Sequence, residues 1–226
     1  MEFSITLVII IITVLVSIGG FSNHKIIDDL IFYPPSVKEG QWYRFLSCGL
    51  IHADFGHLLF NMYALYIFGI GQHKTGVEYS FTAIFGEKGK WIYLLMYVSA
   101  LAICLLPTYS KHRNDYNYRS LGASGAVSAV VFAHILFDPI SGLGLFFIPI
   151  YIASFLFGII YLAVSQWMDR KGAGNVNHSA HIFGSLFGVA FTIVACKLLS
   201  EFPVLDLFIQ QIKHMDPSQI IQAGRY

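Results

Sequence analysis

Residues 121–130, LGASGAVSAV, place a serine among small residues at the start of an apolar run that carries no charge. In a membrane helix, glycine, alanine and serine allow a neighbouring helix to approach closely. A serine hydroxyl is also a nucleophile when a base lies within hydrogen-bond distance of it. The stretch is compatible with both roles for Ser124, so the remaining sequence must reveal whether a base can reach it.

The composition of the chain indicates a membrane protein. Of its 226 residues, 56% are hydrophobic and only 12% are charged, whereas soluble domains carry about 25% charged residues. This apolar excess predicts a chain that crosses a bilayer repeatedly. The net charge of +1 offers no basic field for nucleic acid. Three widely spaced cysteines suggest neither a disulfide framework nor a zinc knuckle.

Six apolar runs are long enough to cross the hydrocarbon layer, which takes roughly 17 to 25 residues. We therefore expect an all-α polytopic membrane protein, a single six-span domain over residues 1–226. No lysine or arginine precedes the first run, so we interpret it as a span and not as a secretory signal. In the tail, 201–226, apolar residues share one face of 203–213, which predicts a short amphipathic helix. The expected spans are 3–20, 47–71, 91–107, 121–137, 143–166 and 179–200.

Polar residues stand at the start of the second, fourth and sixth spans, which all begin on the same side of the membrane. In the second, Asp54 is placed to cap a helix on which His57 and Asn61 share one face. Intramembrane polar groups cost free energy, so each calls for a reason. A histidine or serine of this kind commonly serves helix packing alone. Three such groups at one depth instead predict a common site.

The sixth span supplies a base for Ser124. Ala180, Gly184 and Gly188 recur every four residues and make a flat face beside His181. Close packing of this face on the slim fourth span would bring the imidazole within roughly 3 Å of the serine hydroxyl. Because spans four to six contain no acidic residue, we expect a dyad and not a triad. The side chains of His57 and Asn61 and the backbone N–H of Ser124 are candidate oxyanion donors.

These residues resemble the motifs of the rhomboid family of intramembrane serine proteases. The resemblance rests on HADFGHLLFN at 52–61, GASG at 122–125 and AHIFGSLFG at 180–188, and on their order in a six-span layout. It implies a serine endopeptidase in which Ser124 is the nucleophile and His181 the base. Further matching positions are the supporting residues His57, Asn61, Gly122 and His52 and the motif residues Arg44, Glu78, Gly125, Gly184 and Gly188.

The resemblance also implies the setting of the enzyme. It predicts a protein of the bacterial inner membrane with both termini in the cytoplasm and an active site open to the outer face. The expected partners are the lipid bilayer and transmembrane protein substrates, cleaved near their outer ends, with no nucleic acid, metal or cofactor. Two positions depart from the family pattern. Tyr43 separates Trp42 from Arg44, and Ser128 stands where many members carry a tyrosine that supports the catalytic ring.

Alternative interpretations remain open from the sequence. Four imidazoles gather near the same span starts and are a plausible metal-ligand set by type: His52, His57, His178 and His181. A catalytically inactive scaffold that binds transmembrane clients in the same groove is the other alternative. The glycine-rich loop 170–177 is either a mobile cap over the site or an ordinary connection.

Overall fold

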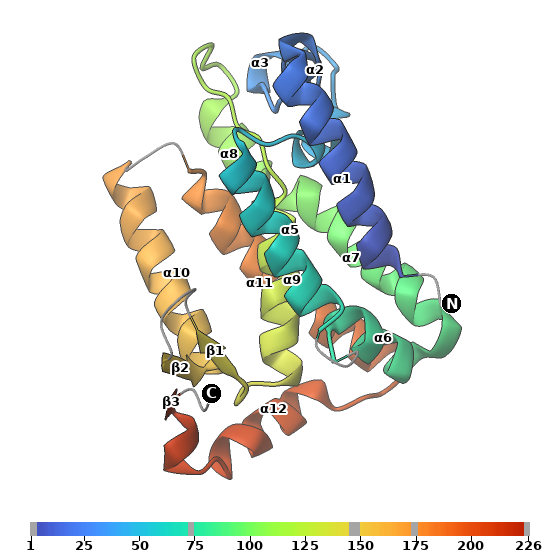
Figure 1. Ribbon diagram of the computed structural model, residues 1–226, viewed down its shortest axis with the longest axis vertical. Helices are drawn as coiled ribbons and strands as arrows, with labels where there is room; N and C mark the ends of the chain where they lie inside the picture. Colours follow the sequence, from blue (N-terminus) through green and yellow to red (C-terminus); the bar gives the residue numbers. More distant parts are fainter. Residues whose placement is uncertain (1–3, 72–74, 145–149, 173–175, 224–226) are drawn as a thin grey trace.

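The computed structural model describes residues 4–71, 75–144, 150–172 and 176–223, and the chain is mostly helical (Figure 1). Side-chain caps begin several of its helices: Ser4 accepts a hydrogen bond from the backbone N–H of Leu7, and Asn177 accepts one from Ala180. Such caps satisfy backbone donors that have no partner inside the helix. The main helices are α1 (Ile5–Ser22), α5 (Phe55–Gly69), α7 (Gly89–Ile103), α9 (Ser124–Phe137), α10 (Ser154–Lys171) and α11 (His178–Leu199).

Short elements connect these helices. By length and apolar composition alone, three stretches of the described residues can cross a membrane: Ile5–Ser22, Val77–His112 and His178–Leu199. The second comprises α6, η3, α7 and α8, and Ser124–Phe137 is a shorter apolar helix. The short helices are α2 (His24–Leu30), α3 (Pro34–Lys38), α4 (Arg44–Ser47), η1 (Cys48–Leu50), α6 (Val77–Phe85), η3 (Gly86–Lys88), α8 (Leu106–His112), α12 (Val204–Lys213) and η4 (Pro217–Gln219).

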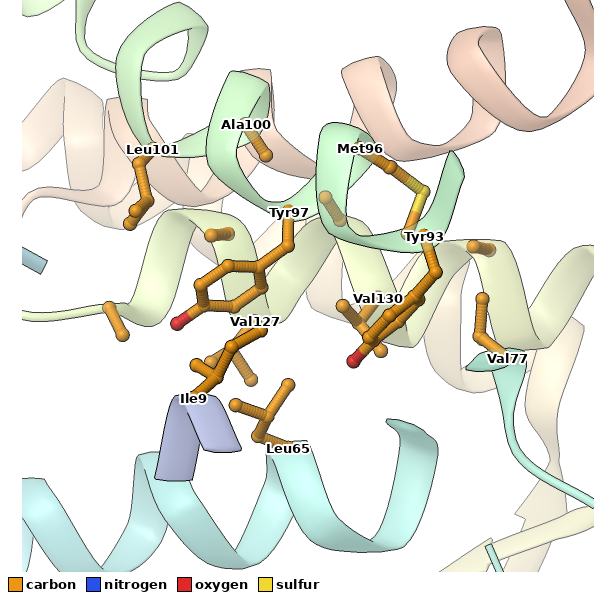
Figure 2. Packing of buried hydrophobic residues seen from close by; sticks show 14 of the residues in the cluster. Ile9, Leu65, Val77, Tyr93, Met96, Tyr97, Ala100, Leu101, Val127 and Val130 are labelled. Atoms are coloured by element: carbon orange, nitrogen blue, oxygen red, sulfur yellow. The ribbon is translucent and has the colours of Figure 1, made fainter. Parts of the chain in front are cut away.

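Helix α9 lies at the centre of the bundle (Figure 1). Its most extensive contact is with α11, and it also packs on α5, α7 and α10. Figure 2 shows the apolar core between α1, α5, α7 and α9. Ring and aliphatic side chains fill this space, and their close van der Waals contacts stabilise the packing of the helices. The fully buried members include Leu65, Tyr93, Met96 and Val130.

The connection between α9 and α10 is a β-hairpin. Strands β1 (Gly142–Gly144) and β2 (Ile150–Ala153) pair antiparallel, and β3 (Ile221–Ala223) joins the free edge of β2. The helix therefore begins at Ser154 and not near residue 143, which corrects the expected start of the fifth span. Gly142 and Gly144 disfavour a helix, and pairing with the tail satisfies the backbone of β2 instead. Residues 145–149 of that expected span lie outside the described chain.

The other helices differ from the expected runs mainly at their ends. Within 47–71, α4 and η1 precede α5, which begins only at Phe55 after the Asp54 cap. The tail segment 203–213 contains α12, which packs against α9. Val204 of α12 is buried, and Gln211 donates a hydrogen bond to the carbonyl of Phe137 (3.2 Å). This contact places α12 across the end of the bundle where α9 terminates (Figure 1).

Candidate active site

Ser124 and His181 meet between the first turns of α9 and α11. The Oγ atom of Ser124 lies 2.7 Å from Nε2 of His181, although 57 residues separate the two in the chain. This distance is within hydrogen-bond range for a hydroxyl and an imidazole nitrogen. Within the described residues, the imidazole of His181 forms this hydrogen bond and none with a carboxylate. The arrangement is therefore a pair and not a triad.

Small residues allow α9 and α11 to approach this closely. A Cβ atom added to Gly184 would overlap the carbonyl of Gly125, and one added to Gly188 would overlap the backbone of Ala129. Both glycines are buried in the interface. With side chains at these positions the helix axes would have to move apart. The predicted close contact of the two helices is present.

A turn before α9 and the start of α5 form another wall of the site. Asp54 caps α5 as predicted, because its carboxylate accepts the backbone N–H of His57 (2.8 Å). Gly122 has a φ of +110°, which side chains rarely adopt. A Cβ atom on Gly122 would also lie 2.6 Å from Cε1 of His57. Gly122 thus lets the His57 ring lie against the turn that leads to Ser124. Asn61, one turn further, is buried and donates to the His57 carbonyl (2.9 Å).

His52 connects this turn to α1. Its ring is fully buried, and Nε2 lies 3.4 Å from the backbone nitrogen of Ala123. Its Nδ1 atom lies 3.0 Å from Oγ of Ser17, which donates to the carbonyl of Leu50 (2.9 Å). These contacts fit a neutral ring protonated on Nδ1, with Nε2 accepting the N–H of Ala123. His52 therefore braces the residue that precedes Ser124.

The paired residues open into a cavity of about 660 Å³. Its walls are mostly apolar and carry a smaller number of polar groups, which is typical of a ligand-binding pocket. The wall includes Ser124, His181, His57, Asn61, Phe157 and Tyr161. Tyr161 has no counterpart among the sequence-based expectations. No spacing rule points to it, because its closeness to His181 depends on how α10 packs against α11.

Comparisons with known proteins identify the family of the chain. A family model described as the rhomboid domain matches residues 39–198, which is more than half of the chain and includes Ser124 and His181. The chain belongs to the rhomboid family. It is accordingly a multi-pass membrane protein.

Curated rhomboid relatives are distant in sequence. The chain is 28% identical over 174 residues to RHOMBOID-like protein 12, mitochondrial, of Arabidopsis thaliana, which covers 73% of this chain and 50% of that protein. It is 27% identical over 180 residues to putative rhomboid protease YdcA of Bacillus subtilis, covering 75% of each. It is 29% identical over 175 residues to Rhomboid-like protein 11, chloroplastic, of Arabidopsis thaliana, covering 72% and 54%. The chain spans about half the length of the two plant relatives.

Two charged positions predicted from the rhomboid resemblance lie in structural networks. Arg44 is buried and donates from Nη1 to the carbonyls of Asp28 (2.8 Å) and Ile31 (2.7 Å), and from Nε to Gln41 (2.6 Å). It therefore holds the segment after α1. Glu78 of α6 is likewise buried and caps the start of α1. Its carboxylate accepts the hydroxyl of Ser4 (2.8 Å) and the backbone N–H groups of Ile5 (2.7 Å) and Thr6 (3.0 Å).

Two ring contacts are present among the four histidines considered as metal ligands. The rings of His52 and His57 lie 4.9 Å apart, and those of His178 and His181 lie 5.8 Å apart. Among the described residues, no group of three or more histidine, cysteine, aspartate or glutamate side chains is arranged to hold a metal ion. In the loop 170–177, residues 173–175 lie outside the described chain, and the expected cap falls on them.

Proposed function

We propose that this rhomboid is an intramembrane serine endopeptidase in which Ser124 is the nucleophile and His181 the general base. The single observation that carries the proposal is the 2.7 Å contact between Ser124 Oγ and His181 Nε2 on the wall of the cavity. A hydroxyl becomes a competent nucleophile when an adjacent base can accept its proton. The match to the rhomboid domain over residues 39–198 supports the same assignment.

The chemistry follows the usual acyl-transfer sequence. Ser124 Oγ attacks the carbonyl carbon of the scissile peptide bond while Nε2 of His181 takes the hydroxyl proton. The imidazolium then gives this proton to the leaving amine, and the C–N bond breaks to leave an ester on Ser124. A water molecule, deprotonated by the same Nε2, hydrolyses the ester. The hydroxyl of Ser124 regains its proton from the imidazolium.

The negative oxygen formed during the attack needs hydrogen-bond donors. His57 and Asn61 of α5 line the cavity together with Ser124, and the Asn61 amide has a second N–H besides the one that it donates to the His57 carbonyl. The backbone N–H of Ser124 belongs to the first turn of α9, where N–H groups have no partner within the helix. The positive end of the helix dipole acts in the same direction. We assign these groups to the oxyanion site, with Gly122 and His52 holding the turn that presents them.

The length of α9 supports a catalytic site inside the membrane. Its 14 residues extend about 21 Å at 1.5 Å per residue, whereas the hydrocarbon core is about 30 Å thick. A helix of this length that ends at one surface starts well below the other. We therefore propose one domain of six spans, α1, α5, α7, α9, α10 and α11, in which Ser124 lies beneath the outer face of the cell membrane. Both termini are then cytoplasmic.

The substrates that we propose are transmembrane segments of other membrane proteins. A peptide bond inside a helix is a poor target, because its carbonyl is hydrogen-bonded and its backbone is covered by side chains. A segment with small or helix-breaking residues near its outer end can present an extended peptide bond to Ser124. Cleavage is thus expected near the outer face, where the local helix unwinds most easily.

Cleavage of a model transmembrane substrate tests the proposal. In proteoliposomes, Ser124→Ala should lower the cleavage rate by at least about 1000-fold, because the variant lacks the nucleophile. Ser80→Ala is the matched control, since Ser80 lies on α6 and, among the described residues, its hydroxyl donates to the carbonyl of Gly76, the N-cap of that helix. A fluorophosphonate should label wild-type protein on Ser124. Cleavage by Ser124→Ala would overturn the assignment, and binding without cleavage or labelling in the wild type would indicate a scaffold.

A further inference from the structure

The ring of Tyr161 lies against the imidazole of His181. The two ring centroids are 6.2 Å apart and their planes differ by 19°. Offset-stacked aromatic rings have centroids about 4.5 to 7 Å apart, and this pair falls within that range. Tyr161 comes from α10, whereas Ser124 and His181 come from α9 and α11. Three helices therefore converge on one pair of catalytic side chains.

Ser128 holds the other end of Tyr161. The two hydroxyl oxygens lie 2.8 Å apart, and Ser128 is buried one turn after Ser124 on α9. Phe132 and Phe157 pack on the same ring, at centroid distances of 5.8 and 6.1 Å. A tyrosine fixed at its hydroxyl and on its sides has little freedom to rotate. It is a rigid surface for the ring that it faces.

The imidazole of a dyad needs a neighbour that fixes its orientation, and the ring of Tyr161 is such a neighbour for His181. In a triad, a carboxylate on the far ring nitrogen holds the imidazole in its working orientation. Within the described residues, His181 has no such carboxylate partner. Ser128 stands at the position where many rhomboids carry a supporting tyrosine, and its short side chain instead bonds to Tyr161. The imidazole thus receives an aromatic neighbour from a different helix.

We propose that Tyr161 is a positioning residue for His181 and that Ser128 anchors it, an inference that rests on the proposed protease function. The support of the catalytic ring is thereby moved from α9 to α10. The first residue of α10 is hydrogen-bonded to the segment that follows α9. The hydroxyl of Ser154 donates to the carbonyl of Asp138, and its backbone N–H donates to the carbonyl of Ser141. The orientation of the imidazole consequently depends on how α10 sits beside α11.

Kinetics separate this role from a passive part of the substrate wall. Tyr161→Leu removes the stacked ring and should lower kcat at least about 10-fold with KM changed by less than about 3-fold, since small misplacement of a catalytic group costs rate. Tyr161→Phe keeps the ring and loses only its hydrogen bond to Ser128, so its kcat should lie between those of wild type and Tyr161→Leu. Trp167→Leu is the control, because Trp167 is an exposed aromatic of the same helix outside the cavity. A rise in KM alone for Tyr161→Leu would overturn the inference.

The role of Ser128 is tested by a double-mutant cycle. Ser128→Ala and Tyr161→Phe each remove the same hydrogen bond. The double variant should therefore have the same kcat as the slower of the two single variants. Interacting residues give such non-additive effects. Fully additive losses would show that Ser128 and Tyr161 act independently, which contradicts anchoring.

A spectroscopic measurement does not depend on catalysis. In protein with ¹³C-labelled histidine, the ring current of Tyr161 should shift the carbon-bound proton signals of the His181 imidazole, assigned with His181→Gln. The shift should persist in Tyr161→Phe and Trp167→Leu and disappear in Tyr161→Leu. No change in Tyr161→Leu would overturn the inference while leaving the role of Ser124 intact. Conversely, cleavage by Ser124→Ala would remove the proposed function without altering this shift.

Discussion

Gly184 of α11 packs directly on the backbone of Gly125 in α9, beside both members of the candidate dyad. Gly125 follows Ser124 in the chain, and Gly184 lies one turn after His181. A Cβ atom at Gly184 has no room beside the Gly125 carbonyl. The same contact that holds the two helices together thus sets the distance between hydroxyl and imidazole.

Gly184→Val should therefore damage both stability and catalysis. Overpacking a close interface costs typically about 1 to 3 kcal/mol, and any separation of α9 and α11 lengthens the Ser124 to His181 contact. We expect a lower thermal midpoint in detergent and a cleavage rate reduced at least about 10-fold. Ala190→Val places the same side chain at an exposed position of α11 and should leave both quantities nearly unchanged. A fully active, stable Gly184→Val protein would contradict the packing described.

Glu78 should contribute to stability and not to the chemical step. Its buried carboxylate accepts three hydrogen bonds at the start of α1. Glu78→Ala leaves those donors without a partner, which costs about 1 to 3 kcal/mol. Glu78→Gln keeps one acceptor oxygen, so its stability should lie between those of wild type and Glu78→Ala. Unfolding curves measure the loss, and kcat per folded molecule should stay close to wild type. A selective fall in kcat would assign Glu78 to catalysis instead.

Loss of the His57 side chain should slow the reaction more than it weakens substrate binding. Removing one donor from an oxyanion site typically lowers kcat by about 100- to 1000-fold. We expect His57→Ala to behave in this way. A fluorophosphonate should still label Ser124 in this variant, but at a lower rate than in wild type. Steady-state kinetics give the two parameters separately. An unchanged kcat with a raised KM would place His57 in substrate binding alone.

His52 and Ser17 should behave as one unit. The ring of His52 links the Ser17 hydroxyl of α1 to the backbone of Ala123. Each single alanine variant leaves buried polar groups unsatisfied, at a cost of about 1 to 3 kcal/mol. Because the two share a network, the double variant should lose less than the sum by roughly 0.5 kcal/mol or more. A double-variant loss equal to the sum of the two single losses would mean that Ser17 and His52 are not energetically coupled.

Chelation tests the metal alternative directly. His181 contacts the Ser124 hydroxyl, and among the described residues no group of three or more histidine, cysteine, aspartate or glutamate side chains is arranged to hold a metal ion. We expect cleavage to survive prolonged treatment with EDTA and a competing zinc chelator and to be abolished by a fluorophosphonate. Restoration of activity by added Zn²⁺ after chelation would support a metal site over the dyad.

The sequence by itself determined the membrane class and the main parts of the site. The periodicity of small residues in α9 and α11 predicts their close contact, because the absence of a side chain is a local property that any helix preserves. Span parity predicts one depth for His57, Ser124 and His181, and the structure has all three on the wall of one cavity. The cap by Asp54 is local too. The hairpin at 142–153 escaped this reasoning, because a short apolar run does not distinguish strand from helix by periodicity.

Only the tertiary structure decided the contacts between residues that are far apart in the chain and share no pattern. Glu78 caps a helix that begins more than 70 residues earlier, and nothing in the local sequence of α6 indicates that acceptor role. The sequence shows only that Ser128 is not a tyrosine. The fold shows that its hydroxyl bonds to the hydroxyl of Tyr161. Tyr161 reaches His181 because of the rotation and depth of α10 beside α11. These are set by packing over the whole interface and not by the spacing of any motif.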